Sequence, residues 1–320
     1  MRILVTGGAG FIGSNFVKKC ISSQFSAIES VIVLDSLTYA GTLTNFTALE
    51  LKQFEFVNGD IRDLNLVNSL ISRVNAVVNF AAESHVDRSI DGSTEFISTN
   101  IIGTHNLLEA VRKQENVRFL QVSTDEVYGS ISEGAWSENE PLLPNSPYSA
   151  SKASADLLVR SYFRTHGLDV ITTRCSNNYG PNQYPEKIIP LFVTNLIDDL
   201  KIPVYGDGMN SRDWLHVDDH CFGIYLALTS GKSGEIYNIG GGTELSNLDL
   251  TSTILQYLGK DDTYIKYVSD RKGHDLRYSV NINKISKELG YTPKKNFAEY
   301  LPETIEWYIK NEKWWRPLKK

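Results

Sequence analysis

A hydroxyl and two adjacent carboxyl groups follow a stretch of chain that we expect to be a buried strand. The strand is the apolar run 117–122, and the three side chains are those of Thr124, Asp125 and Glu126. In an open parallel sheet, ligands bind outside the carboxyl ends of the strands. The pattern therefore predicts a ligand site in which carboxyl groups can transfer protons. The alternative is structural, because both acids could cap the following turn or pair with Arg88.

Tyr148 and Lys152 lie four residues apart, at helical spacing. Two side chains at this spacing share a helix face, and an ammonium beside a phenol stabilises the phenolate and lowers its pKa. Such a tyrosine can accept the proton of a substrate hydroxyl, and Thr124 could bind the same oxygen. The pair is common by chance, so its weight depends on a hydride acceptor being held nearby.

A glycine-rich loop near the start of the chain could hold that acceptor. It spans residues 7–13, between a predicted strand at 2–6 and a predicted helix at 14–21. Such a loop lets the backbone approach a pyrophosphate at the helix N-terminus. The next strand, 31–34, ends in Asp35, whose carboxylate could accept hydrogen bonds from a ribose diol. Since no arginine follows Asp35 directly, the sequence favours NAD over NADP, and the predicted chemistry is oxidation of an alcohol.

Asp125 and Glu126 are more than alcohol oxidation requires. Adjacent residues leaving a strand point apart, so the two acids can address different atoms of one substrate. Once a ring carbon becomes a ketone, a carboxylate can remove the acidic hydrogen on its neighbour. A carboxylic acid can then protonate a hydroxyl one carbon further on, and water leaves. The acid pair therefore predicts a dehydration with no net use of NAD.

Composition narrows the class of protein. The 320 residues are 41% hydrophobic and 22% charged, which are globular values. A net charge of −6 argues against a general nucleic-acid binder. The three cysteines form no close pair, so we expect neither a disulfide framework nor a metal site. No apolar run reaches the roughly 18 residues of a membrane span, and no signal peptide is apparent, so we expect a cytoplasmic protein without a membrane partner.

The elements that must position these groups form a repeating pattern in the first half of the chain. Six predicted strands alternate with helices, at 2–6, 31–34, 54–57, 76–80, 117–122 and 169–174. This alternation predicts an α/β fold with a doubly wound parallel sheet. After a polar turn expected at 175–181 the periodicity changes, which predicts a smaller mixed α/β lobe woven into the C-terminal half. The expected division is 1–174, with returns at about 211–240, and mainly 175–320, with a cleft between them.

Several motifs together resemble one superfamily over essentially the whole chain. They span residues 7–13, 81–89, 123–129, 148–152, 177–181 and 212–214. The resemblance is to the extended short-chain dehydrogenase/reductase superfamily, and within it to the dTDP-glucose 4,6-dehydratase family. The triplet Thr124-Asp125-Glu126 is its most discriminating part, because sugar-nucleotide epimerases of the superfamily usually lack the acid pair.

The resemblance implies roles for the catalytic residues. Tyr148 takes the C4 hydroxyl proton of dTDP-glucose, while Lys152 lowers its pKa and holds the nicotinamide ribose. Thr124 binds the same oxygen. Asp125 protonates the departing C6 hydroxyl, and Glu126 removes the C5 proton. Hydride returned to C6 gives dTDP-4-keto-6-deoxyglucose, so the resemblance implies a lyase of deoxysugar biosynthesis with an NAD-binding Rossmann domain.

The resemblance also assigns binding residues. Those at cofactor positions, besides Tyr148 and Lys152, are Gly7, Gly10, Phe11, Ile12, Gly13, Asp35, Asp60, Ile61, Phe80, Ala81, Ala82, Thr99 and Asn178. Those at nucleotide-sugar positions, besides Thr124, are Ser84, Asn177, Lys187, Pro203, Tyr205, Arg212, Asn247, Arg271 and His274. From its position, Asp60 could bond the adenine amino group.

Other readings stay open at this stage. Lys272 stands where the family usually has proline, which leaves the preference for the nucleotide base open. The alternatives are a dehydratase of a UDP- or CDP-linked sugar, a nucleotide-sugar epimerase, and a non-catalytic NAD-sensing or RNA-associated protein. The predicted long helices 94–113 and 148–166 could pair across a two-fold axis, so we expect a homodimer.

Overall fold

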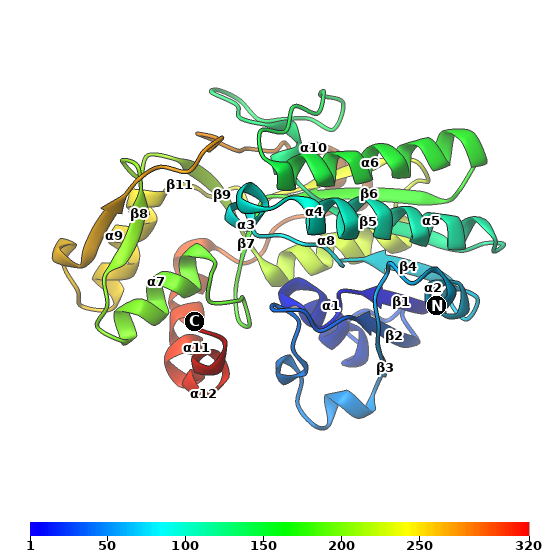
Figure 1. Ribbon diagram of the computed structural model, residues 1–320, viewed down its shortest axis with the longest axis horizontal. Helices are drawn as coiled ribbons and strands as arrows, with labels where there is room; N and C mark the ends of the chain where they lie inside the picture. The colour runs from blue at the N-terminus through cyan, green and yellow to red at the C-terminus, as the bar shows by residue number, and fades with distance from the viewer. Residues whose placement is uncertain (320) are drawn as a thin grey trace.

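One parallel sheet organises the chain in the computed structural model, which describes residues 1–319 (Figure 1). Within these residues the sheet has seven strands in the order β10-β6-β5-β4-β1-β2-β3. Their bounds are Arg2–Thr6 (β1), Ser30–Asp35 (β2), Glu55–Asn58 (β3), Ala76–Asn79 (β4), Arg118–Thr124 (β5), Val170–Cys175 (β6) and Ile236–Ile239 (β10). The strand order reverses between β1 and β4, and such a switch point opens a crevice at the carboxyl ends of the strands.

Helices cover both faces of this sheet, as Figure 1 shows. On one face, α1 and α8 contact each other and bury apolar side chains such as Phe16 and Ile224 against the strands. On the other face, α2, α5 and α6 do the same with Leu107 and Val159. The bounds are Phe11–Ile21 (α1), Leu64–Ile71 (α2), Thr104–Arg112 (α5), Pro147–His166 (α6) and Val217–Ser230 (α8). Apolar burial on both faces is what makes the strands read as continuous apolar runs.

The second lobe has its own small sheets and core. The sheets have the orders β11-β9-β7 and β12-β8. A separate apolar cluster fills the space between these strands and the helices beside them. The elements are Asn177–Tyr179 (β7), Ile202–Tyr205 (β8), Ser211–His216 (β9), Glu244–Ser246 (β11), Ile265–Val268 (β12), Ile188–Ile197 (α7), Asn247–Tyr257 (α9), Phe297–Lys310 (α11) and Glu312–Trp315 (α12). The predicted α/β fold, a doubly wound sheet with a smaller mixed lobe, is confirmed.

Two local features differ from the expected pattern. Residues 177–179 are a strand rather than part of a polar turn, because β7 pairs in parallel with β9, Asn177 opposite Trp214. Residues 94–112 are helical as expected, but a π-helical segment, Ile97–Gly103, lies between α4 (Thr94–Phe96) and α5. The strand depends on a contact between distant parts of the chain, which a local sequence pattern does not contain.

The remaining helices are short. They are Val86–Asp91 (α3), beside the carboxyl end of the sheet, and Asn283–Leu289 (α10), which contacts α8 and β10. None of the helices within residues 1–319 is both long enough and apolar enough to cross a membrane.

Candidate active site

The glycine loop between β1 and α1 is packed so closely that side chains would not fit. Gly7 has a φ of +67°, and a Cβ there would lie 2.6 Å from the backbone nitrogen of Ala81. A Cβ on Gly13 would lie 2.3 Å from the carbonyl oxygen of Gly7. The loop therefore leaves bare backbone at the N-terminus of α1, where a pyrophosphate can be bound by N–H groups and the helix dipole.

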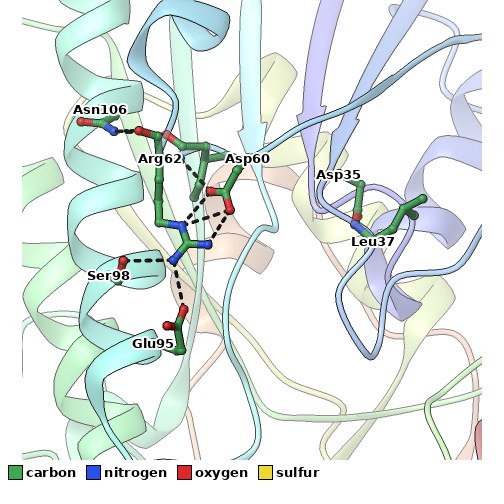
Figure 2. Close-up of polar contacts among 8 residues, drawn as sticks. Asp35, Leu37, Asp60, Arg62, Glu95, Ser98 and Asn106 are labelled. Atoms are coloured by element: carbon green, nitrogen blue, oxygen red, sulfur yellow. Dashed lines mark hydrogen bonds and ion pairs between the residues drawn. The ribbon is translucent and has the colours of Figure 1, made fainter.

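Asp35 and Asp60 lie at the ends of neighbouring strands but differ in how their carboxylates are engaged (Figure 2). Asp35 is buried, and its oxygens accept one backbone N–H each, from Ala9 at 2.9 Å and Leu37 at 2.8 Å. Lone pairs remain for a ribose diol. Asp60 instead accepts the backbone N–H and the guanidinium of Arg62.

Arg62 links Asp60 to a helix across the cleft. Its Nη1 donates to Glu95 at 3.0 Å and to Ser98 at 3.2 Å (Figure 2). This arginine borders the cleft together with Asp60 and Glu95, and sequence analysis had not selected it. Its signal was weak, because an arginine two residues after an aspartate is typical of any exposed turn.

A cleft of about 340 Å³ runs along the carboxyl ends of the strands. Every residue predicted to bind the cofactor lines it: Gly7, Gly10, Phe11, Ile12, Gly13, Asp35, Asp60, Ile61, Phe80, Ala81, Ala82, Thr99, Tyr148, Lys152 and Asn178. The closely packed glycines leave bare backbone for a dinucleotide pyrophosphate, and the carboxylate of Asp35 would repel a 2′-phosphate. These residues therefore fit NAD.

Helix α6 carries Tyr148 and Lys152 into this cleft. It begins with a capping box, in which Ser146 and Ser149 satisfy each other's backbone N–H groups, and Pro147 occupies the first turn. Lys152 is 5% exposed and donates from Nζ to the carbonyl of Val122 at 2.7 Å. Both functional side chains are therefore held by the first two turns of one helix.

The pKa of Tyr148 is raised in the protein alone. Burial raises it well above its ordinary value, and the nearby groups of Glu126, Cys175 and Asp125 raise it further, whereas a hydrogen bond with Thr124 lowers it. Burial also lowers the pKa of Lys152. The expected lowering of the phenol pKa by the ammonium stays a prediction.

Asp125 and Glu126 occupy a short 3₁₀ turn, Asp125–Tyr128, directly after β5. Asp125 is 1% exposed and its Oδ2 has no hydrogen-bond partner within residues 1–319. Burial raises its pKa well above the usual range, and Glu126 and Asp213 add to that rise. An acid in such surroundings holds its proton.

The surroundings of Glu126 are different. Burial raises the pKa of Glu126, but the cations of Arg212, Lys187 and Arg271 oppose the rise. Arg212 also opposes the rise in the pKa of Asp125, but less strongly than burial and the two neighbouring acids raise it. Burial raises the pKa of both carboxyl groups, and three cations oppose the rise for Glu126, so the two groups can serve as acid and base in one reaction.

A second cavity, of about 180 Å³, lies between the sheet and the lobe. The predicted nucleotide-sugar residues divide between the two spaces. Ser84 and Thr124 line the larger cleft, Asn177 and Lys187 line both, and the second cavity is lined by Pro203, Tyr205, Arg212, Asn247, Arg271 and His274. Glu126 also borders both spaces, so a substrate extending from the second cavity would bring its reacting end to the acid pair.

Arg212 is a buried cation with no acidic partner. It is 7% exposed, donates to the carbonyls of Ser211 and Asp275, and stacks over the ring of Tyr278 at 4.5 Å. Among residues 1–319 it forms no ion pair, and the same holds for Lys187, whose Nζ donates to the carbonyl of Ser84. Unpaired cations of this kind suit a diphosphate.

The two remaining predicted residues with ionisable side chains do have partners. Arg271 forms an ion pair with Asp87, Nη2 to Oδ2 at 3.0 Å, and Tyr205 contacts the same oxygen. His274 contacts Asp270 at 2.7 Å. Asp87, Glu186 and Tyr278 are among the lining residues that were not predicted from the sequence, because acidic and phenolic side chains carry no pattern of their own.

Comparisons with known proteins agree with this geometry. The family model described as GDP-mannose 4,6 dehydratase matches residues 4–304. A dTDP-glucose 4,6-dehydratase of Streptomyces antibioticus is 55% identical over 100% of this chain and 96% of its own. A crystal structure of a Streptomyces venezuelae dTDP-glucose 4,6-dehydratase with NAD bound is 55% identical, with a TM-score of 0.97 and 100% of each chain covered.

A third match is more distant in sequence. A dTDP-glucose 4,6-dehydratase of Bacillus anthracis, in complex with NAD, is 50% identical with a TM-score of 0.93, and 100% of each chain is covered. The matched relatives therefore share both the sheet and the lobe with this protein. The chain belongs to the dTDP-glucose 4,6-dehydratase group of the NAD-dependent epimerase/dehydratase family, which are extended short-chain dehydrogenases/reductases.

Proposed function

We propose that this protein dehydrates dTDP-glucose to dTDP-4-keto-6-deoxyglucose. The observation that carries the proposal is the acid pair where the two cavities meet, because three cations oppose the rise in the pKa of Glu126 and Arg212 is only a minor cause for Asp125. Full-length relatives at about half identity are dTDP-glucose 4,6-dehydratases, and this supports the same substrate. An epimerase needs only the oxidation residues, so Asp125 and Glu126 would have no function in its reaction.

The first step assigned to this chain is removal of the C4 hydroxyl proton. Tyr148 accepts this proton, and Thr124 binds the same oxygen. NAD, when bound, takes the C4 hydride and later returns it to C6. Lys152, one helical turn from Tyr148, supplies the positive charge that favours a phenolate. These residues sit at the carboxyl end of β5 and the start of α6, so the sheet orients them.

The second step is loss of water across C5 and C6. Glu126 removes the C5 proton, which is acidic because C4 is now a ketone, and the C5–H electrons form the C5–C6 double bond. Asp125 gives its proton to the C6 hydroxyl, which leaves as water. The proton balance requires Asp125 to enter the step protonated and Glu126 ionised. The cations around Glu126 favour this assignment, because they stabilise its ionised form.

The binding surfaces are assigned from the lining residues. The fifteen predicted cofactor residues, all of which line the larger cleft, would hold NAD, with the glycine loop at the pyrophosphate and Asp35 at the adenosine ribose. Arg212 and Lys187 would bind the substrate diphosphate, and Arg271 would join them on leaving Asp87. The nucleoside would lie by Pro203, Tyr205, Asn247 and His274. Residues 1–174, with returns at about 211–240, thus serve NAD, and 175–320 mainly the nucleotide sugar.

We also infer a homodimer in the cytoplasm. Large apolar side chains are exposed on the helices expected to pair, namely Ile97 and Ile102 in the π-helical segment and Leu157 in α6. Covering them with the same face of a second copy would remove apolar surface from water. The three cysteines are buried and free, which is typical of a reducing compartment.

A panel of nucleotide sugars tests the proposed function. The protein with NAD is incubated separately with dTDP-, UDP- and CDP-glucose and with UDP-N-acetylglucosamine, and the products are analysed by mass spectrometry. We expect loss of one water from dTDP-glucose at the highest rate. A product of unchanged mass that is inverted at C4 would identify an epimerase. No turnover of any compound would favour a non-catalytic role.

A further inference from the structure

Lys152 is buried in a place that disfavours its charge. It is 5% exposed, and Nζ donates to one carbonyl oxygen, that of Val122. Within residues 1–319 it forms no ion pair, and burial lowers its pKa. A neutral amine could not favour a phenolate at Tyr148, so another group must keep Lys152 protonated.

Asp156 lies one helical turn beyond Lys152 on the same face of α6. Side chains at this spacing have Cβ atoms about 5–6 Å apart. Asp156 is 3% exposed, and of the groups that raise the pKa of Lys152 it acts most strongly. It therefore lies behind the Tyr148–Lys152 pair, outside both cavities.

Arg174 on β6 pairs with Asp156. The Nε to Oδ2 distance is 2.9 Å, and Arg174 is as deeply buried as its partner. Burial raises the pKa of Asp156, whereas Arg174, Lys152 and Ser123 oppose that rise. The arginine thus favours the ionised form of Asp156 against the effect of burial.

The pair also reaches the turn that carries the acids. Arg174 Nη1 donates to the hydroxyl of Tyr128 at 2.8 Å, and this hydroxyl donates to Asn238 at 2.9 Å. Tyr128 is fully buried and ends the turn that begins at Asp125. One buried chain of polar contacts therefore connects the helix of the oxidation step to the turn of the elimination step.

We propose that Asp156 is a positioning residue that keeps Lys152 an ammonium, and that Arg174 sustains it. This inference deepens, and rests on, the proposed function.

The other titratable groups around Lys152 do not replace Asp156. Burial keeps the thiol of Cys175 protonated by raising its pKa, and Asp125 is held neutral. The groups that act on the pKa of Lys152 are Asp156 on α6 and Cys175 on β6, and Cys175 in turn interacts with Asp125 on the turn and with Tyr148 on α6.

The direct test measures the pKa of Lys152 in the whole protein. Lysine is labelled with carbon-13, the Lys152 signal is assigned with Lys152→Met, and its chemical shift is followed against pH. In Asp156→Asn the pKa of Lys152 should fall by about one unit or more. The matched control is Asp169→Asn, which removes the same charge from the more exposed Asp169–Arg118 pair, and it should leave Lys152 unchanged.

Asp156→Asn leaves Arg174 buried without a counter-charge and so can unfold the protein. The double variant Asp156→Asn/Arg174→Gln removes both charges and keeps the shapes. It should fold and show a fall in the pKa of Lys152 that is smaller than in Asp156→Asn, because loss of the Arg174 cation partly offsets loss of the carboxylate. An unchanged pKa of Lys152 in either folded variant would overturn the proposal.

Kinetics separates this proposal from the proposed function. With dTDP-glucose, the alkaline limb of kcat against pH should move to lower pH in the double variant, because Lys152 loses its proton earlier. A merely structural role would lower kcat equally at all pH values, and that result would also overturn the proposal. If the unaltered protein does not turn over dTDP-glucose, the proposed function fails, while the pKa measurement still decides the role of Asp156.

Discussion

The two sides of the site treat buried charge in opposite ways. On the side of the sheet, Asp125 is a buried acid that forms no ion pair with a cation of residues 1–319. On the side of the lobe, Arg212 is a buried cation that forms no ion pair with an acid of that same part of the chain. An acid can meet burial by keeping its proton, but an arginine cannot give up its charge.

The difference indicates the function of each side of the site. A neutral buried acid is ready to donate a proton, so the sheet side is built for chemistry. A charged buried guanidinium is ready for an anion, so the lobe side is built for binding. Changes on the first side should therefore act mainly on kcat, and changes on the second mainly on KM.

The largest expected effect follows from removing the acid. In Asp125→Asn the dehydration rate should fall by about 10²–10⁴-fold, the usual contribution of a general acid. Oxidation at C4 should persist, so reduced cofactor should accumulate in a single turnover with dTDP-glucose. Stopped-flow absorbance and mass spectrometry of the product measure the two steps. Glu133→Gln, an exposed acid of the 129–148 segment, is the control, and equal loss of both steps in Asp125→Asn would mean a structural role.

The next effect concerns His216, which ends β9 and caps α8, where the lobe meets the sheet domain. Burial lowers its pKa from 6.5 to about 4. The unfolded chain binds the proton first, so the stability from neutral His216 is present above pH 6.5 and is lost as pH falls through about 4. The loss is on the order of 3 kcal/mol.

Urea unfolding at several pH values measures this effect. His216→Asn should flatten the fall in unfolding free energy between pH 6.5 and 4. If the variant kept the full slope, other groups would control acid unfolding, and His216 would not connect the two regions in this way.

Arg212→Met tests the binding role expected of the lobe side. Hydrogen bonds to charged groups contribute about 1.5–3 kcal/mol, so KM for dTDP-glucose should rise by roughly tenfold to a hundredfold. The effect on kcat should be much smaller. Steady-state kinetics with saturating NAD checks the split, and a fall in kcat at unchanged KM would place Arg212 in the chemical step instead.

Asp87→Asn should have the smallest effect. It frees Arg271 from its half-buried ion pair, which contributes up to about 1 kcal/mol. KM for dTDP-glucose should then fall by a few-fold, because Arg271 no longer has to leave the carboxylate of Asp87 before it binds the substrate diphosphate. Substrate titration of the two proteins side by side is sufficient, and a raised KM would show that Asp87 itself contacts the substrate.

The sheet side was largely predictable from the sequence. The glycine loop, Asp35 and the Tyr148–Lys152 pair lie within short motifs, and the alternation of strands and helices implied that their ends meet. The predicted residues that line the second cavity were identified from the family resemblance, position by position. No local sequence pattern predicted them.

What the sequence did not contain are effects of three-dimensional surroundings. β7 depends on pairing with β9. The raised pKa of Tyr148 depends on burial beside Glu126, and the Asp156–Arg174 pair joins a helix to a strand. Each is a contact between segments far apart in the chain, so residue types and spacing alone could not predict it.

The most direct test of the central claim is the product formed from dTDP-glucose in heavy water, analysed by mass spectrometry and nuclear magnetic resonance. If Glu126 and Asp125 perform the elimination, the product has lost one water, carries deuterium at C5 and is a 4-ketone, with no net reduced NAD. A product that retains the C6 hydroxyl and is inverted at C4 would contradict the account.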